Sequence, residues 1–425
     1  MMILLSCFIF QFNQYLYSQG VDVNSKYETS ISTTHIKTLR AYVQGNELSY
    51  PAIELNSKQK IQIEFDDLSL DSKDYYYQII HCNNDWTSSE LFSDEFMDGF
   101  NENSVNNYEF SINTTVPYIH YNVVLPNNDV EFLVSGNYVF RVIEGENRDS
   151  TILTARFSIY EPIVNIQTEI IRPLGSEFQN TGQEIRLKIN HAELSISHPF
   201  NDVKVYISQN NRPDRVLKDI KPVFVQNDEL VYNFSGENTF LSGNEFRIID
   251  FNNQHKLGLN INDVQFYDSI YHVQVRLDER RSSKRYLFFE DMNGKYIINV
   301  EDGYDPQIFG DYANVYFSVP MEEPFFDGAV YIYGALNNWK CNYDSRMEYN
   351  FDKKMYEGKL LLKQGYYNYT YAFVNNYDFT IDESVLEGSH YQTENDYVIY
   401  VYHRDFAQKF DRLVGYKVVN SLHAE

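Results

Sequence analysis

Hydrophobic and polar side chains alternate with a period of two along much of this chain, not with the 3.6-residue period of a helix. The clearest runs cover residues 61–66, 75–80, 202–207, 273–278 and 369–373. Successive side chains of a strand point to opposite faces, so each run gives one apolar face and one more polar face. The runs are short and end in clusters of Asn, Asp, Gly or Ser. This pattern predicts an all-β protein of tandem immunoglobulin-like β-sandwiches.

Two Pro-containing segments suggest where one sandwich ends and the next begins. Glu161-Pro162 follows one strand-like run, and residues 302–306 (Asp-Gly-Tyr-Asp-Pro) follow another. Because Pro and Gly interrupt strands, we expect domain boundaries there. The expected division is an amino-terminal sandwich at 19–160, a middle sandwich at 161–305, an early-set sandwich at 306–404 and a tail at 405–425.

An Asn-Asn dipeptide recurs at equal intervals, at positions 83, 210 and 337. Each copy follows a strand-like run and precedes a large side chain, which is Trp86, Arg212 or Trp339. Such a period is expected if the three sandwiches are related repeats. The same dipeptide also occurs elsewhere in this Asn-rich chain, so chance recurrence is the alternative.

Composition excludes several classes of protein. The chain has 60 acidic and 35 basic side chains and a net charge of -25, which argues against binding to nucleic acid or to anionic lipid. A hydrophobic content of 43% and an aromatic content of 16% argue against disorder. The 37 tyrosines favour strands, because each combines an apolar ring with a polar tip.

The amino end has the character of a secretory leader. Residues 2–17 are uncharged and largely apolar, and the chain becomes polar after Ser18. We therefore expect a signal peptide at 1–18, and an envelope compartment for the mature chain. The remaining cysteines, Cys82 and Cys341, are expected in different domains, as free thiols.

No motif for catalysis or for cofactor binding is found in the sequence. His81 and Cys82 are adjacent and would point to opposite faces of a strand, so they cannot act as base and nucleophile. The chain has no Gly-x-Ser-x-Gly, His-Glu-x-x-His, Cys-x-x-Cys or phosphate-loop pattern. We expect no catalytic residue, metal site or cofactor. A hydrolase built on two facing carboxylates stays an alternative, since spacing alone does not exclude it.

The third domain carries an ordered motif of its own. Residues 330–333 run into Asn337, Asn338 and Trp339, and residues 365–371 then follow a Gly-x-Tyr-x-Tyr pattern. This order resembles early-set immunoglobulin-like modules of the glycogen-binding type. The resemblance implies a glycan platform made of Trp339, Tyr367 and Tyr369. The alternative is that these rings only pack the domain.

The first domain carries a more specific series of motifs, at 75–86, 95–100, 108–114, 118–121, 125–127 and 135–138. In this order they resemble the amino-terminal domain of the type IX secretion system plug protein family of Bacteroidota. The resemblance extends over the mature chain, including 388–397 and 410–416. The motif residues, which are either structural or partner-binding, are His81, Cys82, Asn83, Trp86, Gly99, Phe100, Tyr118, Tyr121, Pro126, Gly136, Asn137 and Tyr138.

The resemblance to the plug family implies a binding role and not an enzyme. It places the protein in the periplasm, at the inner face of the outer membrane and without inserting into it. The implied partner is the outer-membrane translocon barrel, whose periplasmic mouth the protein would seal when no substrate passes. The alternative function is a periplasmic or surface glycan-binding protein that acts through the third domain.

Overall fold

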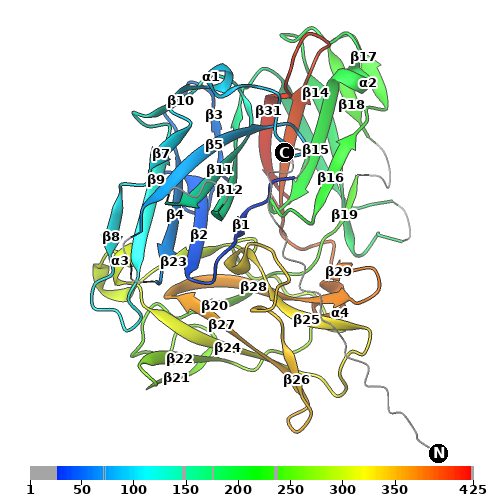
Figure 1. Cartoon of the computed structure of the whole chain (residues 1–425). Coiled ribbons are helices and arrows are strands. Elements are labelled where there is room, and N and C mark those ends of the chain that lie inside the picture. Colours follow the sequence, from blue (N-terminus) through cyan, green and yellow to red (C-terminus); the bar gives the residue numbers. More distant parts are fainter. Residues whose placement is uncertain are drawn as a thin grey trace, which may run out of the picture.

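The computed structural model describes residues 26–422 apart from 70, 72, 146–149, 175–176 and 234–237, so the expected signal peptide at 1–18 lies outside the described residues. Three β-sandwiches meet in a triangle: the first and second stand side by side, and the third lies across their lower ends (Figure 1). The predicted all-β sandwich fold is confirmed. The immunoglobulin-like and early-set subtypes stay predictions.

The first sandwich lies between residues 30 and 160 and has two main sheets. One sheet has the order β1 (Ser30–Ile31), β12 (Thr151–Tyr160), β11 (Gly136–Glu144), β5 (Tyr75–Cys82) and β7 (Glu102–Ser104), with β3 (Ala52–Glu54) parallel to β12. The other has the order β2 (Ile36–Val43), β4 (Ile61–Asp67), β9 (Ile119–Leu125) and β8 (Tyr108–Phe110). At the upper end lie α1 (Ser93–Phe96) and the pair β6 (Met97–Gly99) and β10 (Val130–Phe132).

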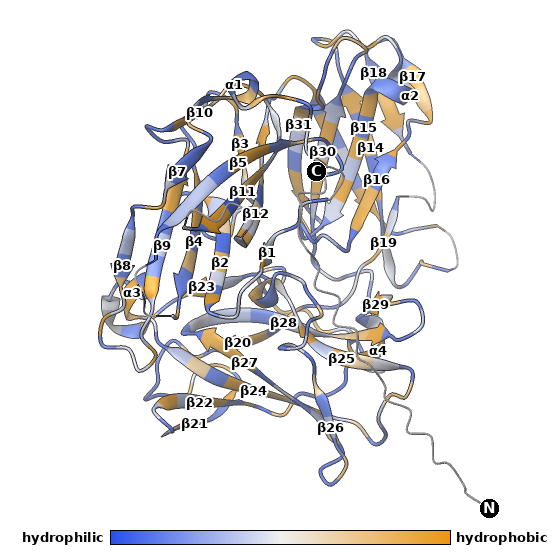
Figure 2. Ribbon diagram, in the orientation of Figure 1, coloured by the Kyte–Doolittle hydropathy of each residue, from blue (hydrophilic) through white to orange (hydrophobic). Residues whose placement is uncertain are grey.

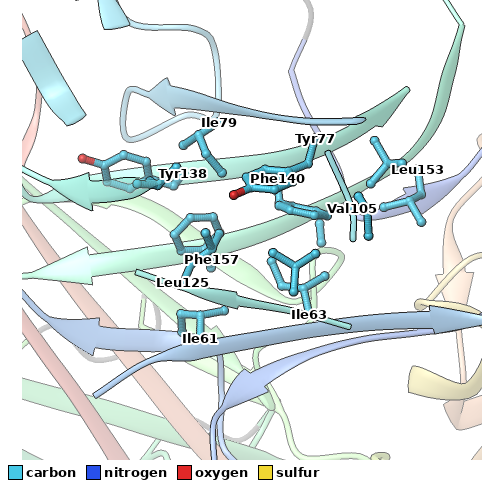
Figure 3. Packing of buried hydrophobic residues seen from close by; sticks show 14 of the residues in the cluster. Ile61, Ile63, Tyr77, Ile79, Val105, Leu125, Tyr138, Phe140, Leu153 and Phe157 are labelled. Carbon is cyan, nitrogen blue, oxygen red and sulfur yellow. The ribbon is translucent and has the colours of Figure 1, made fainter. Parts of the chain in front are cut away.

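The core of the first sandwich follows from the alternation. Ile61 and Ile63 of β4 point inward against Tyr77, Phe140 and Phe157 of the opposite sheet (Figure 3). Their burial supplies the main driving force for pairing the two sheets.

The second sandwich combines strands from two distant parts of the chain. Its first sheet has the order β13 (Asn165–Ile171), β14 (Gly182–Asn190), β18 (Glu229–Tyr232) and β17 (Phe224–Gln226), with β19 (Thr239–Leu241) on β14. Its second sheet has the order β16 (Val216–Ile220), β15 (Val203–Gln209), β30 (Asp396–His403) and β31 (Arg412–Asn420), with α2 (Pro199–Asp202) before β15. Hydrophobic residues alternate with more polar ones along β14 and β15 (Figure 2).

The third sandwich is inserted between β19 and β30. One sheet is formed by β20 (Arg247–Asp250), β28 (Gly365–Asn375) and β23 (Tyr296–Ile298), with β25 (Gly328–Tyr333) and β29 (Ile381–Asp382) also on β28. The other has the order β21 (Ile261–Tyr267), β22 (Ile270–Val275), β24 (Tyr312–Pro320), β27 (Met355–Lys363) and β26 (Glu348–Asn350). The short helices are η1 (Glu301–Gly303), α3 (Pro306–Phe309), η2 (Ala335–Asn337) and α4 (Ser384–Glu387).

These pairings divide the chain differently from the expected boundaries at 305 and 404. β20 to β23 belong to the third sandwich, and β30 and β31 complete the second one. The expected tail is therefore largely a core strand, in which Leu413 and Val414 are fully buried. The physical reason is that strand pairing is non-local: β15 pairs with β30 along its whole length, although the third sandwich lies between them in sequence. Near the earlier expected boundary, β12 ends at Tyr160 and β13 begins at Asn165.

A buried ion pair joins the first sandwich to the third. Asp66 lies on β4, on the face turned away from the first core, and accepts bonds of 2.7 Å from Lys363 Nζ and from the Tyr312 hydroxyl. Asp66 and Lys363 are 1% and 0% exposed. Although burial opposes ionisation, the charge of Lys363 and the hydrogen bond from His120 hold the pKa of Asp66 below its usual value. The carboxylate is therefore charged inside the protein and depends on its partners there.

We expect the substitution Lys363→Met to lower the free energy of unfolding by about 3–5 kcal/mol, because it leaves the Asp66 carboxylate buried without its cation. The double variant Asp66→Asn with Lys363→Met should recover part of that loss. Urea unfolding measures both. Lys354→Met is the control, since it removes an exposed ion pair with Glu322, and we expect no measurable change. A double variant no more stable than Lys363→Met would contradict the role given to this pair.

Candidate functional site

Part of the predicted motif lies where the first sandwich meets the second. Asn137 is fully buried on β11 and donates to the Asn83 carbonyl oxygen at 3.0 Å. Its own amide oxygen accepts from the hydroxyl of Tyr402 on β30 at 2.8 Å. In the same region, the backbone N–H of Asn84 donates to the Asp411 carboxylate at 3.0 Å. This part of the motif thus holds the two sandwiches together.

His81 forms a compact unit with two further motif residues. Its Nδ1 lies 2.8 Å from Ser89 Oγ, and its ring packs edge to face on Tyr138 at 4.9 Å. Gly136 has a φ of +148°, and a Cβ there would lie 2.4 Å from His81 Nε2, so the position requires glycine. Burial lowers the pKa of His81 to about 4, so the ring is neutral at pH 7.

The other motif residues are spread over the first sandwich. Tyr118 bonds across to the third sandwich, through the carbonyl oxygens of Gln307 and Gly310. Cys82 and Tyr121 are buried. Gly99 ends β6, where a Cβ would collide with Asp129, and Phe100 after it is exposed. Pro126 follows β9 and a cis peptide bond.

The expected glycan platform of Trp339, Tyr367 and Tyr369 does not agree with the structure. Tyr367 and Tyr369 are 2% and 1% exposed in the third core. Their hydroxyls donate to the Lys363 carbonyl oxygen and to Asp278. A sugar platform needs exposed aromatic faces, and the alternation that puts Tyr367 and Tyr369 on one face of β28 turns that face inward.

The three sandwiches form an open pocket of about 440 Å³ where they meet, which we call the junction pocket. Both tryptophans of the chain, Trp86 from the first sandwich and Trp339 from the third, line it. The second sandwich contributes Tyr400 and Tyr402 of β30. Aromatic side chains from all three sandwiches thus line the pocket.

The repeated Asn-Asn dipeptides converge on this pocket. Asn84, Asn210, Asn211 and Asn338 all line it. Left-handed backbone conformations recur in the same three loops, with φ values of 53° at Asn210, 55° at Asn338 and 70° at Trp86. Asn adopts this conformation more readily than most residues, which suits Asn to the second and third loops, whereas in the first loop Trp86 adopts it. The sequence period therefore marks three loops that meet at one place.

Cations lie on the aromatic rings of the pocket. The Arg156 guanidinium lies 4.4 Å from the Trp86 ring centre, and the Arg212 guanidinium 4.5 Å from that of Trp339. Lys295 Nζ lies 3.7 Å from the centre of the Tyr50 ring. Burial lowers the pKa of Lys295 to about 8 and that of Arg156 to about 10. The sequence marked Arg212, which follows the second Asn-Asn dipeptide. Arg156 and Lys295 did not stand out, because each meets its ring only through the fold.

Metal ligands and a reactive thiol are not found among the described residues. No group of three His, Cys, Asp or Glu side chains in the described ranges could hold a metal ion. Burial raises the pKa of both Cys82 and Cys341 to about 12, which disfavours a thiolate. No described helix has the length and hydropathy of a membrane span.

The third sandwich presents a cluster of exposed rings, which we call the aromatic tip. It consists of Phe326, Tyr377 and Phe379, which are 86%, 83% and 76% exposed. Their two loops precede β25 and follow β28, and are joined by a bond of 2.8 Å from the Asn376 amide to the Asp327 carbonyl oxygen. Exposed aromatic clusters of this kind are typical of protein-binding surfaces.

Comparison with known proteins agrees with the motif series. Residues 36–161 match the family model described as Type 9 secretion system plug protein 1st domain. A hypothetical protein from Parabacteroides merdae ATCC 43184, known from a crystal structure, is 36% identical, with a TM-score of 0.90. That similarity covers 93% of this chain and 100% of the other. No curated protein matches.

The fold and the motif series together define an all-β protein of three interlocked sandwiches, in which the first carries the plug-domain pattern. The chain belongs to the type IX secretion system plug protein family, as its sequence motifs predicted.

We expect stability to fall in mild acid because of His81. The unfolded chain takes up a proton at the ordinary pKa of 6.5, whereas folded His81 does so only near 4. Unfolding should therefore become easier as pH falls between these values, by up to about 3 kcal/mol. The free energy of unfolding, measured with urea at a series of pH values, should depend less steeply on pH for His81→Gln than for the native chain. His255→Gln, at an exposed histidine, is the control and should keep the native slope. Equal slopes for all three would refute the assignment.

Proposed function

We propose that this protein is a periplasmic plug, which binds the periplasmic mouth of the type IX translocon barrel and seals it when the barrel is idle. The observation that carries the proposal is the match of residues 36–161 to the plug-domain family. The proposed role is binding, without catalysis, at the inner face of the outer membrane.

The arrangement of the three sandwiches suits that task. A plug must keep its shape against a wide opening, and here each sandwich is bonded to both others. Asp66 with Lys363 joins the first to the third, Asn137 with Tyr402 the first to the second, and Arg212 with Glu383 the second to the third. Because these contacts are buried, separating the sandwiches would expose polar groups that now satisfy one another.

The aromatic tip is the surface we assign to the barrel contact. Aromatic side chains lose little conformational entropy on binding and bury a large area, so three exposed rings can anchor a reversible complex. The net charge of -25 favours a protein partner over the anionic lipid around the barrel.

Affinity purification of the tagged chain from bacterial envelopes tests the proposal. The native chain should recover the translocon barrel, and deletion of its gene should make the outer membrane permeable to large solutes. The triple variant Phe326→Ser, Tyr377→Ser and Phe379→Ser should lower barrel recovery roughly tenfold or more, as expected for the loss of hot-spot rings.

The matched control is Phe92→Ser with Phe200→Ser, which removes two exposed rings near α1 and α2 at the other end of the molecule (Figure 1). It should keep native recovery. If the native chain recovers no barrel subunit, the plug role is wrong. If only the control pair loses recovery, the role stands and the assigned surface is wrong.

A further inference from the structure

The junction pocket has a chemical character that the plug role does not use. Its volume of about 440 Å³ lies within the range of pockets that hold small organic ligands. Its walls carry nine aromatic residues: Tyr42, Tyr50, Trp86, Phe157, Tyr206, Tyr296, Trp339, Tyr400 and Tyr402. Rings of this kind favour a planar or ring-shaped ligand, which they can contact face on or edge on.

Most cations of the pocket are already neutralised by carboxylates. Arg212 is paired with Asp214 and Glu383, and Arg40 with Glu47 and Glu64. Lys340 lies 3.3 Å from Glu28. These residues shape the wall, but they leave little charge for a ligand.

Arg156 is different. Its guanidinium donates to the Tyr27 carbonyl oxygen and lies on Trp86, and no carboxylate of the described chain lies within 4.0 Å of its nitrogens. At close range its charge is met by a neutral oxygen and a ring, while the charge of Glu28 acts from beyond 4.0 Å. This arrangement suits the recognition of an anion.

Lys295 supplies a second cation on the wall of the same pocket. Its Nζ donates to the Leu48 carbonyl oxygen at 2.7 Å, while the closest carboxylate, Asp396, is 3.8 Å away and already accepts a bond from Tyr50. Among the described residues, the pocket thus holds one cation with no carboxylate within 4.0 Å and one whose closest carboxylate is 3.8 Å away. Burial lowers the pKa of both cations, and the charges of Glu28 on Arg156 and of Asp396 on Lys295 offset only part of that effect.

We propose that the junction pocket binds a small aromatic anion, whose negative group pairs with Arg156 and Lys295 and whose ring packs among Trp86, Trp339 and the tyrosines. The ligand is either a free aromatic acid or the carboxyl-terminal aromatic residue of a protein chain, since both offer the same chemistry. Because the pocket walls come from all three sandwiches, the bound ligand also adds contacts between them and stabilises their arrangement.

The two tryptophans give a direct assay, because the chain has no others. The probe is the fluorescent aromatic anion 8-anilinonaphthalene-1-sulfonate, which accepts excitation energy from nearby tryptophan. Titration of the native chain should give saturable binding of one probe per chain, with energy transfer from tryptophan. Arg156→Gln should weaken the probe roughly tenfold, the effect of losing one charge-assisted bond. Arg276→Gln, at an exposed arginine, is the matched control and should bind as the native chain does.

Competition on the native chain tests the need for charge without any substitution. 4-Hydroxyphenylpropionate should displace the probe, and its neutral amide should not. The peptide acetyl-Gly-Ser-Gly-Tyr, with a free carboxylate, represents the carboxyl-terminal residue of a protein, and its amide is the uncharged control. Comparing this peptide acid with 4-hydroxyphenylpropionate distinguishes a protein terminus from a free aromatic acid. Tighter binding of the peptide acid assigns a protein terminus, and tighter binding of the free acid assigns a small molecule. The absence of saturable transfer, or equal displacement by acid and amide, would overturn the proposal.

Discussion

The carboxylate of Asp66 is the constraint on which much of this structure depends. It sits on β4, directly across from His120 on β9, on the sheet face opposite the first core. A buried charge is tolerated only when its partners are in place, and two of them, Lys363 and Tyr312, come from the third sandwich. The first and third sandwiches must therefore pack in one relative position, because any other position would leave the Asp66 carboxylate buried without its cation.

The same logic gives the abundance of tyrosine a physical meaning. The rings of Tyr118, Tyr312 and Tyr402 are buried, while their hydroxyls reach acceptors on a neighbouring sandwich. Where all three sandwiches meet, the hydroxyl of Tyr50 in the first sandwich donates to Asp396 in the second. Lys295 of the third sandwich lies over the ring of Tyr50. An apolar body with a polar tip is well suited to an interface that must be both dry and specific. The result is one interlocked body, which is the property a plug requires.

The sequence predicted the strands well and their partners poorly. Alternation located β4, β5, β15, β22 and β28, because it reports local burial on one face. It could not show that the polar face of β4 is also buried, or that β30 and β31 return to the second sandwich, since both depend on distant segments. The family motifs identified the family, and the Asn-Asn repeat marked the pocket loops. Arg156 and Lys295 could not be found this way, because their partners come from other parts of the fold.

In the plug role we propose, the three locked sandwiches act as one body against the translocon. Electron cryomicroscopy of the barrel purified through the tagged chain tests this most directly. We expect density across the periplasmic opening into which the whole structure fits as a single rigid body, with the aromatic tip against the barrel. Barrels whose opening is empty, or sandwiches that have moved apart from one another in the complex, would contradict it.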